Sequence, residues 1–258
     1  MTTFSTSAFL IRKVDYGDAD RIVTLFTRRC GKVAAIAKSA KKSSRRFGGV
    51  LELFSEMDVV CRVGKKGGML LLQEASLRQP FPAIRSDVVK TAYASYWADI
   101  VHQWMESEQV NEGIFELLAH AFTELDQGTT PAAAVSVLFQ LQFLAMAGLA
   151  PNLEACAKCG KPLEAGASGG FPFSLEKGGV QCPRCSRAEP EGPGRVQLSV
   201  GTVMQLRWVG NRRLPAAARI RFTDQALVEG SRLLEAFVPY HLDRFPKSLR
   251  VLRQLRDA

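Results

Sequence analysis

The sequence predicts an α+β protein in which a small β-barrel or sandwich precedes a helical region that carries a four-cysteine metal module. Three observations lead to this prediction. Short strand patterns separated by glycine-containing turns fill the first eighty residues. A helical period replaces them from Ser86 onwards. Two C-x2-C pairs then interrupt the helices between Cys156 and Cys185.

The first domain is expected at residues 1–80. Its strand candidates are rich in apolar residues and end at turns such as DYGDAD (15–20) and GKKGG (64–68). The two prolines of RQPFP (78–82) end the strand region, because proline continues neither a sheet nor a helix pattern. The expected strands are residues 9–14, 21–27, 32–37, 51–63 and 69–77.

The second domain is expected at residues 81–258 and is mainly helical. Apolar residues recur three and four positions apart after Ser86, which predicts a long helix with one apolar face. Gly148 and Pro151 mark the end of the third helix. The expected helices cover residues 88–104, 111–126, 131–147, 199–209 and 223–238, with a basic helical tail at 247–256.

Four of the six cysteines form two C-x2-C pairs separated by twenty-two residues: Cys156, Cys159, Cys182 and Cys185. Two residues between ligands let a tight turn direct both thiolates at one ion, and a second such turn completes a tetrahedron. Four thiolates leave no open position, so the expected zinc is structural, in a module at about 153–188. Two redox pairs are the alternative, although no thioredoxin-like unit surrounds them. Cys30 and Cys61 are expected to fill the barrel interior.

No catalytic site is expected. The chain has only three histidines, and it lacks both a nucleophile elbow and a phosphate-cradling loop. Asp15, Asp18 and Asp20 cluster in a turn, but their spacing lacks the remaining ligands of a calcium loop. We therefore expect a binding protein rather than an enzyme.

The cysteine content and the hydropathy predict a cytoplasmic protein with no membrane partner. No apolar run is long enough and free enough of polar residues to span a bilayer, and the apolar residues near the N-terminus are too few for a signal peptide. In a reducing compartment, cysteines bind metal more often than they form disulfides.

The net charge of +9 is concentrated in one stretch of the chain. Nine Lys or Arg and no acid lie between Arg21 and Leu51, in and around the segment AKSAKKSSRRFGG (37–49). A local cluster of this kind predicts a loop that contacts phosphates, although a solvated loop is the alternative. Phe47 either stacks on a base or packs on the barrel. The candidate DNA-binding residues are Lys38, Lys41, Lys42, Arg45, Arg46, Arg28, Arg29 and Lys32.

Three segments resemble the RecO family of bacterial recombination mediators. The first is AFLIRKVDYGDADRIVTLFTRRCGKVAAIAKSA (8–40), and the second is LRQPFPAIRSDVVKTAYASYWADIV (77–101). The most specific is FQLQFLAMAGLAPNLEACAKCG (139–160), which joins a Gly-Leu-x-Pro helix stop to the metal knuckle. In one place the chain departs from the pattern, because the family's basic loop often begins Lys-Gly and here Ser39 follows Lys38.

The resemblance implies an N-terminal OB-fold barrel followed by a helical domain with zinc. It implies a role in DNA repair, DNA recombination and the response to DNA damage, in the bacterial cytoplasm at the nucleoid. The implied activities are binding of single- and double-stranded DNA, strand annealing, and loading of recombinase on strands coated with single-strand-binding protein. The implied partners are RecR and the acidic C-terminal tail of that coat protein.

Two rival interpretations stay open at this point. One is a zinc-stabilised interaction module whose basic loop binds an acidic protein. The other is a zinc-dependent nuclease, which would need carboxylates or a histidine in the basic stretch. A second basic surface is expected on the tail and would contact an acidic partner through Lys247, Arg250 and Arg253.

Overall fold

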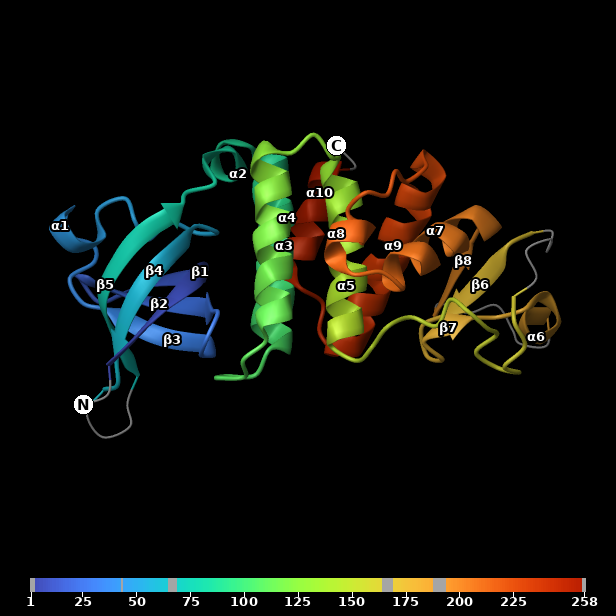
Figure 1. The fold of residues 1–258 in the computed structure, drawn as a ribbon, viewed down its shortest axis with the longest axis horizontal. Coiled ribbons are helices and arrows are strands. Elements are labelled where there is room, and N and C mark those ends of the chain that lie inside the picture. The colour runs from blue at the N-terminus through green and yellow to red at the C-terminus, as the bar shows by residue number, and fades with distance from the viewer. Residues whose placement is uncertain (1–2, 43, 65–68, 164–168, 188–193, 257–258) are drawn as a thin grey trace. The chain divides into compact units, whose positions relative to one another are not determined.

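The computed structural model describes residues 3–42, 44–64, 69–163, 169–187 and 194–256. It divides into two compact units, one formed by Met1–Gly128 with Pro246–Ala258 and the other by Thr129–Phe245. A closed five-stranded barrel comes first in the chain and helices follow it, so the predicted fold class is confirmed (Figure 1). The barrel and the first helices share one compact unit, and the functional division at residue 80 stays a prediction.

The barrel has the strand order β1-β2-β3-β5-β4 and closes by pairing β4 with β1. All pairs are antiparallel except β3 with β5, which run parallel. Such a five-stranded Greek-key barrel is the architecture of an OB-fold. The strands are β1 (Thr3–Tyr16), β2 (Asp20–Thr27), β3 (Gly31–Ala37), β4 (Glu56–Arg62) and β5 (Leu70–Gln79). The short helix α1 (Ser44–Phe47) lies in the connection from β3 to β4.

Two strand boundaries differ from the sequence prediction. β1 already begins at Thr3, because residues 3–9 pair with β4 before the apolar part of the strand starts. β4 begins at Glu56 rather than at Leu51, since Phe54 takes a left-handed backbone conformation (φ 70°) that ends any strand. The turn expected at 64–68 lies outside the described residues from position 65 onwards.

The barrel interior is filled by the inward-facing residues of each strand. Alternate positions such as Val23 and Leu25 are fully buried, as the two-residue period of a strand requires. Cys61 belongs to this core and Cys30 packs partly against it, so both thiols fill the interior as expected. Phe47 and Leu51, in the connection that contains α1, are buried in the same core cluster.

The outer side of the barrel packs against helices of the same unit. These are α3 (Val88–Trp104) and α4 (Glu112–Gln127). The same unit contains α2 (Pro82–Ser86), which packs against α3 and α4, and α10 (Lys247–Arg256), which packs against α3. The ring centroids of Phe9 and Phe115 lie 4.8 Å apart, and Phe122 joins the same aromatic cluster. Asp87 and Asn111 cap α3 and α4 by accepting hydrogen bonds from backbone N–H groups. In Figure 1, α1 lies on the side of the barrel away from α3 and α4.

The second unit combines helices with a three-stranded sheet. The sheet order is β7-β6-β8, and the ring of Phe173 on β6 packs edge-on against Phe237 of α9 at 5.3 Å. The elements are α5 (Ala132–Met146), β6 (Phe171–Ser174), β7 (Gly179–Val180), α6 (Pro183–Arg187), β8 (Arg195–Leu198), α7 (Val200–Gly210), α8 (Leu214–Ala217) and α9 (Asp224–Leu242). None of the helices in the described residues is long and apolar enough to cross a bilayer.

Candidate nucleic-acid interface and metal centre

The four cysteines of the second unit converge on one point. The Sγ atoms of Cys156, Cys159, Cys182 and Cys185 all lie within 4.8 Å of one another, and those of Cys159 and Cys182 are 3.9 Å apart. A tetrahedral zinc with Zn–S bonds of about 2.3 Å requires sulfur atoms about 3.8 Å apart. The geometry and the chemistry of this donor set therefore fit a tetrahedral thiolate site.

Local backbone geometry brings each pair of thiols together. Gly160 donates its N–H to the carbonyl of Cys156 and adopts a left-handed conformation (φ 72°), which closes the first knuckle. Ala157 donates to the carbonyl of Val180, so the first knuckle is fixed to the small sheet. The second pair flanks the start of α6, where Ser186 donates to the carbonyl of Cys182.

Close packing shifts the pKa values of Cys156 and Cys185 in opposite directions. Burial would raise the pKa of the Cys156 thiol, but backbone N–H groups, of which that of Cys182 acts most strongly, lower it to about 6. The pKa of Cys185 is raised, first by desolvation and then by hydrogen bonds with the other thiols. Thiols this close cannot all be deprotonated without a cation, which is why such a cluster binds metal.

The basic loop, defined as residues 38–46, is rooted on the barrel by its backbone. The N–H of Lys41 donates to the carbonyl of Ala19 at 2.9 Å, and the N–H of Ser39 donates to Asp20 Oδ1 at 2.7 Å. Ala40 is buried in the barrel core within the loop itself. The loop is therefore held against the β1–β2 turn and is not a free tail.

The cations of the basic loop differ in how they are engaged. Lys38 and Lys42 are exposed, and within the described residues no ion pair involves either of them. Lys41 lies 3.4 Å from Asp15 Oδ2, and Arg46 donates to the carbonyl of Lys38 at 3.0 Å. The side chain of Arg45 lies outside the described part of the structure.

A groove runs between the basic loop and β5. Its volume is about 710 Å³, and Lys38 and Arg46 lie on its wall. The β5 side contributes a stretch of mainly apolar residues with one acid, Leu71, Leu72, Gln73, Glu74 and Ala75. The groove thus offers positive side chains beside an apolar surface, a combination that suits a nucleotide strand.

The chain matches two family models that together cover nearly its whole length. Residues 1–81 match the model described as Recombination protein O N terminal, and residues 85–250 match Recombination protein O C terminal. It is 46% identical to the DNA repair protein RecO of Desulfatibacillum aliphaticivorans, over 99% of this chain and 98% of that protein. It is 39% identical to the DNA repair protein RecO of Desulfosudis oleivorans, over 99% of both chains.

The chain belongs to the RecO family of DNA repair proteins. The resemblance seen in the N-terminal and knuckle segments is therefore confirmed. The barrel that carries the basic loop is the N-terminal RecO domain, and the cysteine cluster lies in the C-terminal one.

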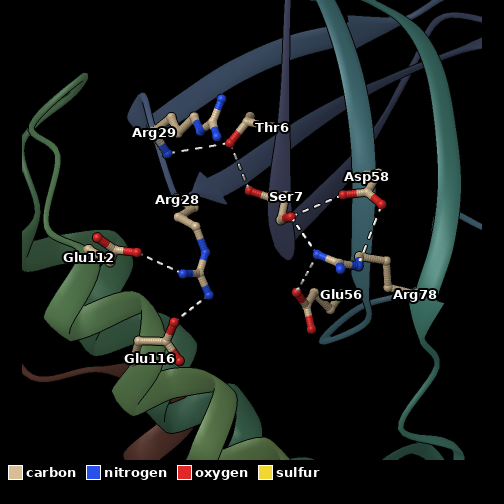
Figure 2. Close-up of polar contacts among 9 residues, drawn as sticks. All are labelled: Thr6, Ser7, Arg28, Arg29, Glu56, Asp58, Arg78, Glu112 and Glu116. Atoms are coloured by element: carbon tan, nitrogen blue, oxygen red, sulfur yellow. Dashed lines mark hydrogen bonds and ion pairs between the residues drawn. The ribbon is translucent and has the colours of Figure 1, made fainter.

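Arg28 and Lys32, two of the eight candidate DNA-binding residues of this RecO-family chain, contact helices of its first unit. Arg28 pairs with Glu112 at 2.7 Å and with Glu116, both on α4 (Figure 2). Its guanidinium lies 4.9 Å from the ring centroid of Phe115. Lys32 donates to the carbonyl of His102 at 2.5 Å, and burial lowers the pKa of this lysine. Both side chains join the barrel to the helices, so we do not assign them to DNA contacts.

Arg29 is exposed next to this junction. Its backbone N–H donates to Thr6 Oγ1 at 3.3 Å, and Figure 2 shows no contact of its guanidinium with the other residues drawn. Further along the same barrel side, Arg78 contacts Ser7, Glu56 and Asp58 (Figure 2). Arg29 keeps its place as a candidate, whereas the charge of Arg78 is already balanced.

Phe47 does not offer a stacking surface. Its side chain is only 3% exposed and belongs to the barrel core. Base stacking needs an accessible ring face, so the packing alternative describes Phe47 and the stacking alternative is dropped. Tyr16, at the end of β1, is an aromatic residue whose side chain is exposed instead, at 56%.

The basic tail forms α10, which packs against α3. Leu249 and Leu252 are fully buried, and Ser248 donates to Asp99 of α3 at 2.5 Å. Lys247 and Arg250 are exposed, whereas Arg253 is half-buried. The tail thus has an apolar face inside the first unit and a basic face outside.

Proposed function

We propose that this RecO-family chain binds single- and double-stranded DNA through its basic loop and the adjoining groove. The observation that carries the proposal is the placement of exposed Lys38 and Lys42 on a loop that is held against a closed barrel. Cations on a fixed loop contact phosphates at a lower entropic cost than cations on a free tail. The interaction is sequence-independent, because lysine and arginine displace the condensed counterions of any strand.

Annealing of complementary strands follows from the same chemistry. A surface that holds two strands lowers their mutual repulsion and raises their local concentration. Neither proton transfer nor nucleotide hydrolysis is needed for this. We propose that the chain thereby assists loading of recombinase on strands coated with single-strand-binding protein, with RecR as its partner.

The tail and the metal centre have accessory roles in this proposal. The exposed basic face of α10, with Lys247 and Arg250, is offered to the acidic tail of the coat protein. The four thiolates would hold one structural zinc, which supplies cross-linking of the two knuckles and leaves no open coordination position.

The test removes two positive charges from the basic loop and measures how the affinity for DNA depends on salt concentration. We expect the double variant Lys38→Ala/Lys42→Ala to bind a single-stranded oligonucleotide more weakly. The slope of log affinity against log salt should also fall by about 1.4, since each phosphate contact contributes about 0.7. Fluorescence anisotropy between low and moderate salt measures both quantities.

The matched control removes the same charge elsewhere. Arg184 and Arg187 are exposed on α6 of the second unit, and the double variant Arg184→Ala/Arg187→Ala should keep the wild-type slope. Equal slopes for wild type and loop variant would contradict the assignment of the loop. Loss of binding to an acidic peptide, with DNA binding intact, would favour the interaction-module interpretation instead.

A further inference from the structure

A second run of cations lies in the second unit, from the end of α7 to the start of α9 (labelled in Figure 1). Residues 207–223 contain five arginines and no aspartate or glutamate. Arg207 pairs with Glu154 at 3.4 Å. The other four are exposed, and within the described part of the chain no ion pair involves them: Arg212, Arg213, Arg219 and Arg221. These four residues are called the arginine surface, and their charge is available to an anionic ligand.

Buried contacts hold the backbone of the arginine surface in place. The Nε2 group of Gln142, a buried residue of α5, donates to the carbonyl of Arg212 at 2.9 Å. The carbonyl of Arg213 accepts the N–H of Ala217 at 3.0 Å, and the side chain of Ala217 is fully buried. Cations on a fixed backbone bind an anion at a lower entropic cost than cations on a free segment.

The short helix α8 sets the spacing of the arginines. Arg213 directly precedes α8, and Arg219 lies two residues beyond its end. Six residues of helix rise about 9 Å. Phosphates of one strand follow one another at about 3.4 Å along a duplex axis, so this spacing matches two to three phosphates.

An exposed tryptophan borders the arginine surface. Trp208 is 38% exposed, and the guanidinium of Arg212 lies 4.4 Å from the centroid of its ring. An aromatic ring stacks on bases, and a guanidinium binds a phosphate through two parallel hydrogen bonds. An acidic peptide offers carboxylates but no flat bases. The pairing of Trp208 with arginines therefore favours a nucleotide strand as the occupant.

We infer that the arginine surface binds a second nucleotide strand, so that one chain holds one strand on the basic loop and another on the second unit. The inference rests on the proposed function, because it takes the basic loop as the first site. Two occupied sites on one chain raise the local concentration of each strand near the other. Binding is independent of sequence, because the contacts are made to phosphates.

The test counts the strands bound per chain. Sedimentation analysis uses an oligothymidylate of about ten nucleotides, a length that one OB-fold site occupies. At a concentration that just saturates wild type, wild type should bind about two strands and Arg213→Glu/Arg219→Glu about one. Charge reversal should weaken binding of the second strand by about 100-fold or more, because glutamate repels the phosphates that arginine attracts.

Two control variants keep the outcome interpretable. Arg184→Glu/Arg187→Glu reverses the same charge on α6 of the second unit and should bind as many strands as wild type. Arg213→Lys/Arg219→Lys keeps the charge of the arginine surface and should keep the second strand. Loss of the second strand in either control would overturn the inference.

Reversal of the loop charges distinguishes failure of the inference from failure of the proposed function. Lys38→Glu/Lys42→Glu should bind about one strand, held by the arginine surface. If wild type binds a single strand that the loop variant loses and Arg213→Glu/Arg219→Glu keeps, only the inference is overturned. If the loop variant binds as wild type does, the proposed function is overturned and the inference with it.

An oligoglutamate peptide tests the other kind of polyanion. It should bind the arginine surface more weakly than the oligothymidylate does. If the peptide binds there and no strand does, the surface belongs to an acidic protein partner and the inference is overturned.

Discussion

At the scale of single residues, Ser39 occupies a position whose backbone conformation suits glycine. It follows Lys38 at the start of the basic loop. Ser39 adopts φ 58°, the left-handed conformation that glycine favours. The loop backbone therefore keeps the geometry of a glycine loop, and the serine bears a conformational strain at the root of the basic loop.

Replacing Ser39 with glycine should stabilise the protein. Relief of the left-handed conformation gains about 1 to 2 kcal/mol, and the greater freedom of glycine in the unfolded chain offsets about 0.5 to 1 of it. We expect Ser39→Gly to raise the free energy of unfolding by about 0.5 to 1 kcal/mol in a denaturant titration.

The reverse substitution nearby is the control. Gly17 has φ 57°, and a Cβ at that position would meet no atom within 4 Å. Gly17→Ala should therefore lower stability through backbone strain alone, by about 1 kcal/mol. A destabilised Ser39→Gly variant would show that the serine side chain contributes more than its conformation costs.

The roles of individual cations could be predicted only in part. Clustering in the sequence identified the basic loop, and the structure places Lys38 and Lys42 at its surface. The same clustering could not reveal that Arg28 is paired, because its partner Glu112 lies 84 residues further along the chain. Local charge patterns do not reveal such long-range pairs.

At the scale of elements, the convergence of the four cysteines is the feature that the sequence predicted best. Both knuckles are local turns, so the C-x2-C spacing alone places each pair of thiols. The groove beside the basic loop could not be predicted in this way. It forms between Lys38 and residues 71–75, which meet only because β3 and β5 pair in parallel.

Removing one thiol should empty the metal centre. Purified wild type should contain about one zinc per chain, and Cys159→Ser should contain almost none, because three thiolates and a hydroxyl bind zinc far more weakly. Cys30→Ala is the control, since Cys30 lies in the barrel and should not alter zinc content. Elemental analysis of both variants measures this directly.

The two units should differ in how their stability responds to loss of zinc. Loss of zinc should lower the unfolding temperature of the second unit, where the knuckle is hydrogen-bonded to the small sheet. DNA binding by the barrel should persist in Cys159→Ser. Full zinc occupancy in this variant would contradict the four-thiolate site.

At the scale of the whole molecule, the last helix returns to the first unit. α10 belongs to the same compact unit as the barrel, although more than 100 residues of the second unit separate them in sequence. A chain truncated at Asp243 would lose the buried Leu249 and Leu252 together with the basic face. Charge substitutions at Lys247 and Arg250 therefore test binding of an acidic tail more cleanly than truncation does.

The overall architecture could be predicted from the sequence because its apolar residues recur with a clear strand period in the first domain and a clear helical period in the second. Alternation predicted the strands and the three-to-four spacing predicted the helices, but neither predicts that α10 packs against α3. That contact depends on buried leucines at the far end of the chain meeting an apolar face formed much earlier. Periodicity reports which face is apolar and not what covers it.

The central claim is that the basic loop carries the DNA-dependent activity of the chain. The most direct measurement is the rate at which two complementary strands, each coated with single-strand-binding protein, anneal in the presence of each variant. Wild type and Arg184→Ala/Arg187→Ala should accelerate annealing equally, and Lys38→Ala/Lys42→Ala should lose most of the acceleration. Annealing by the loop variant at the wild-type rate would contradict the claim.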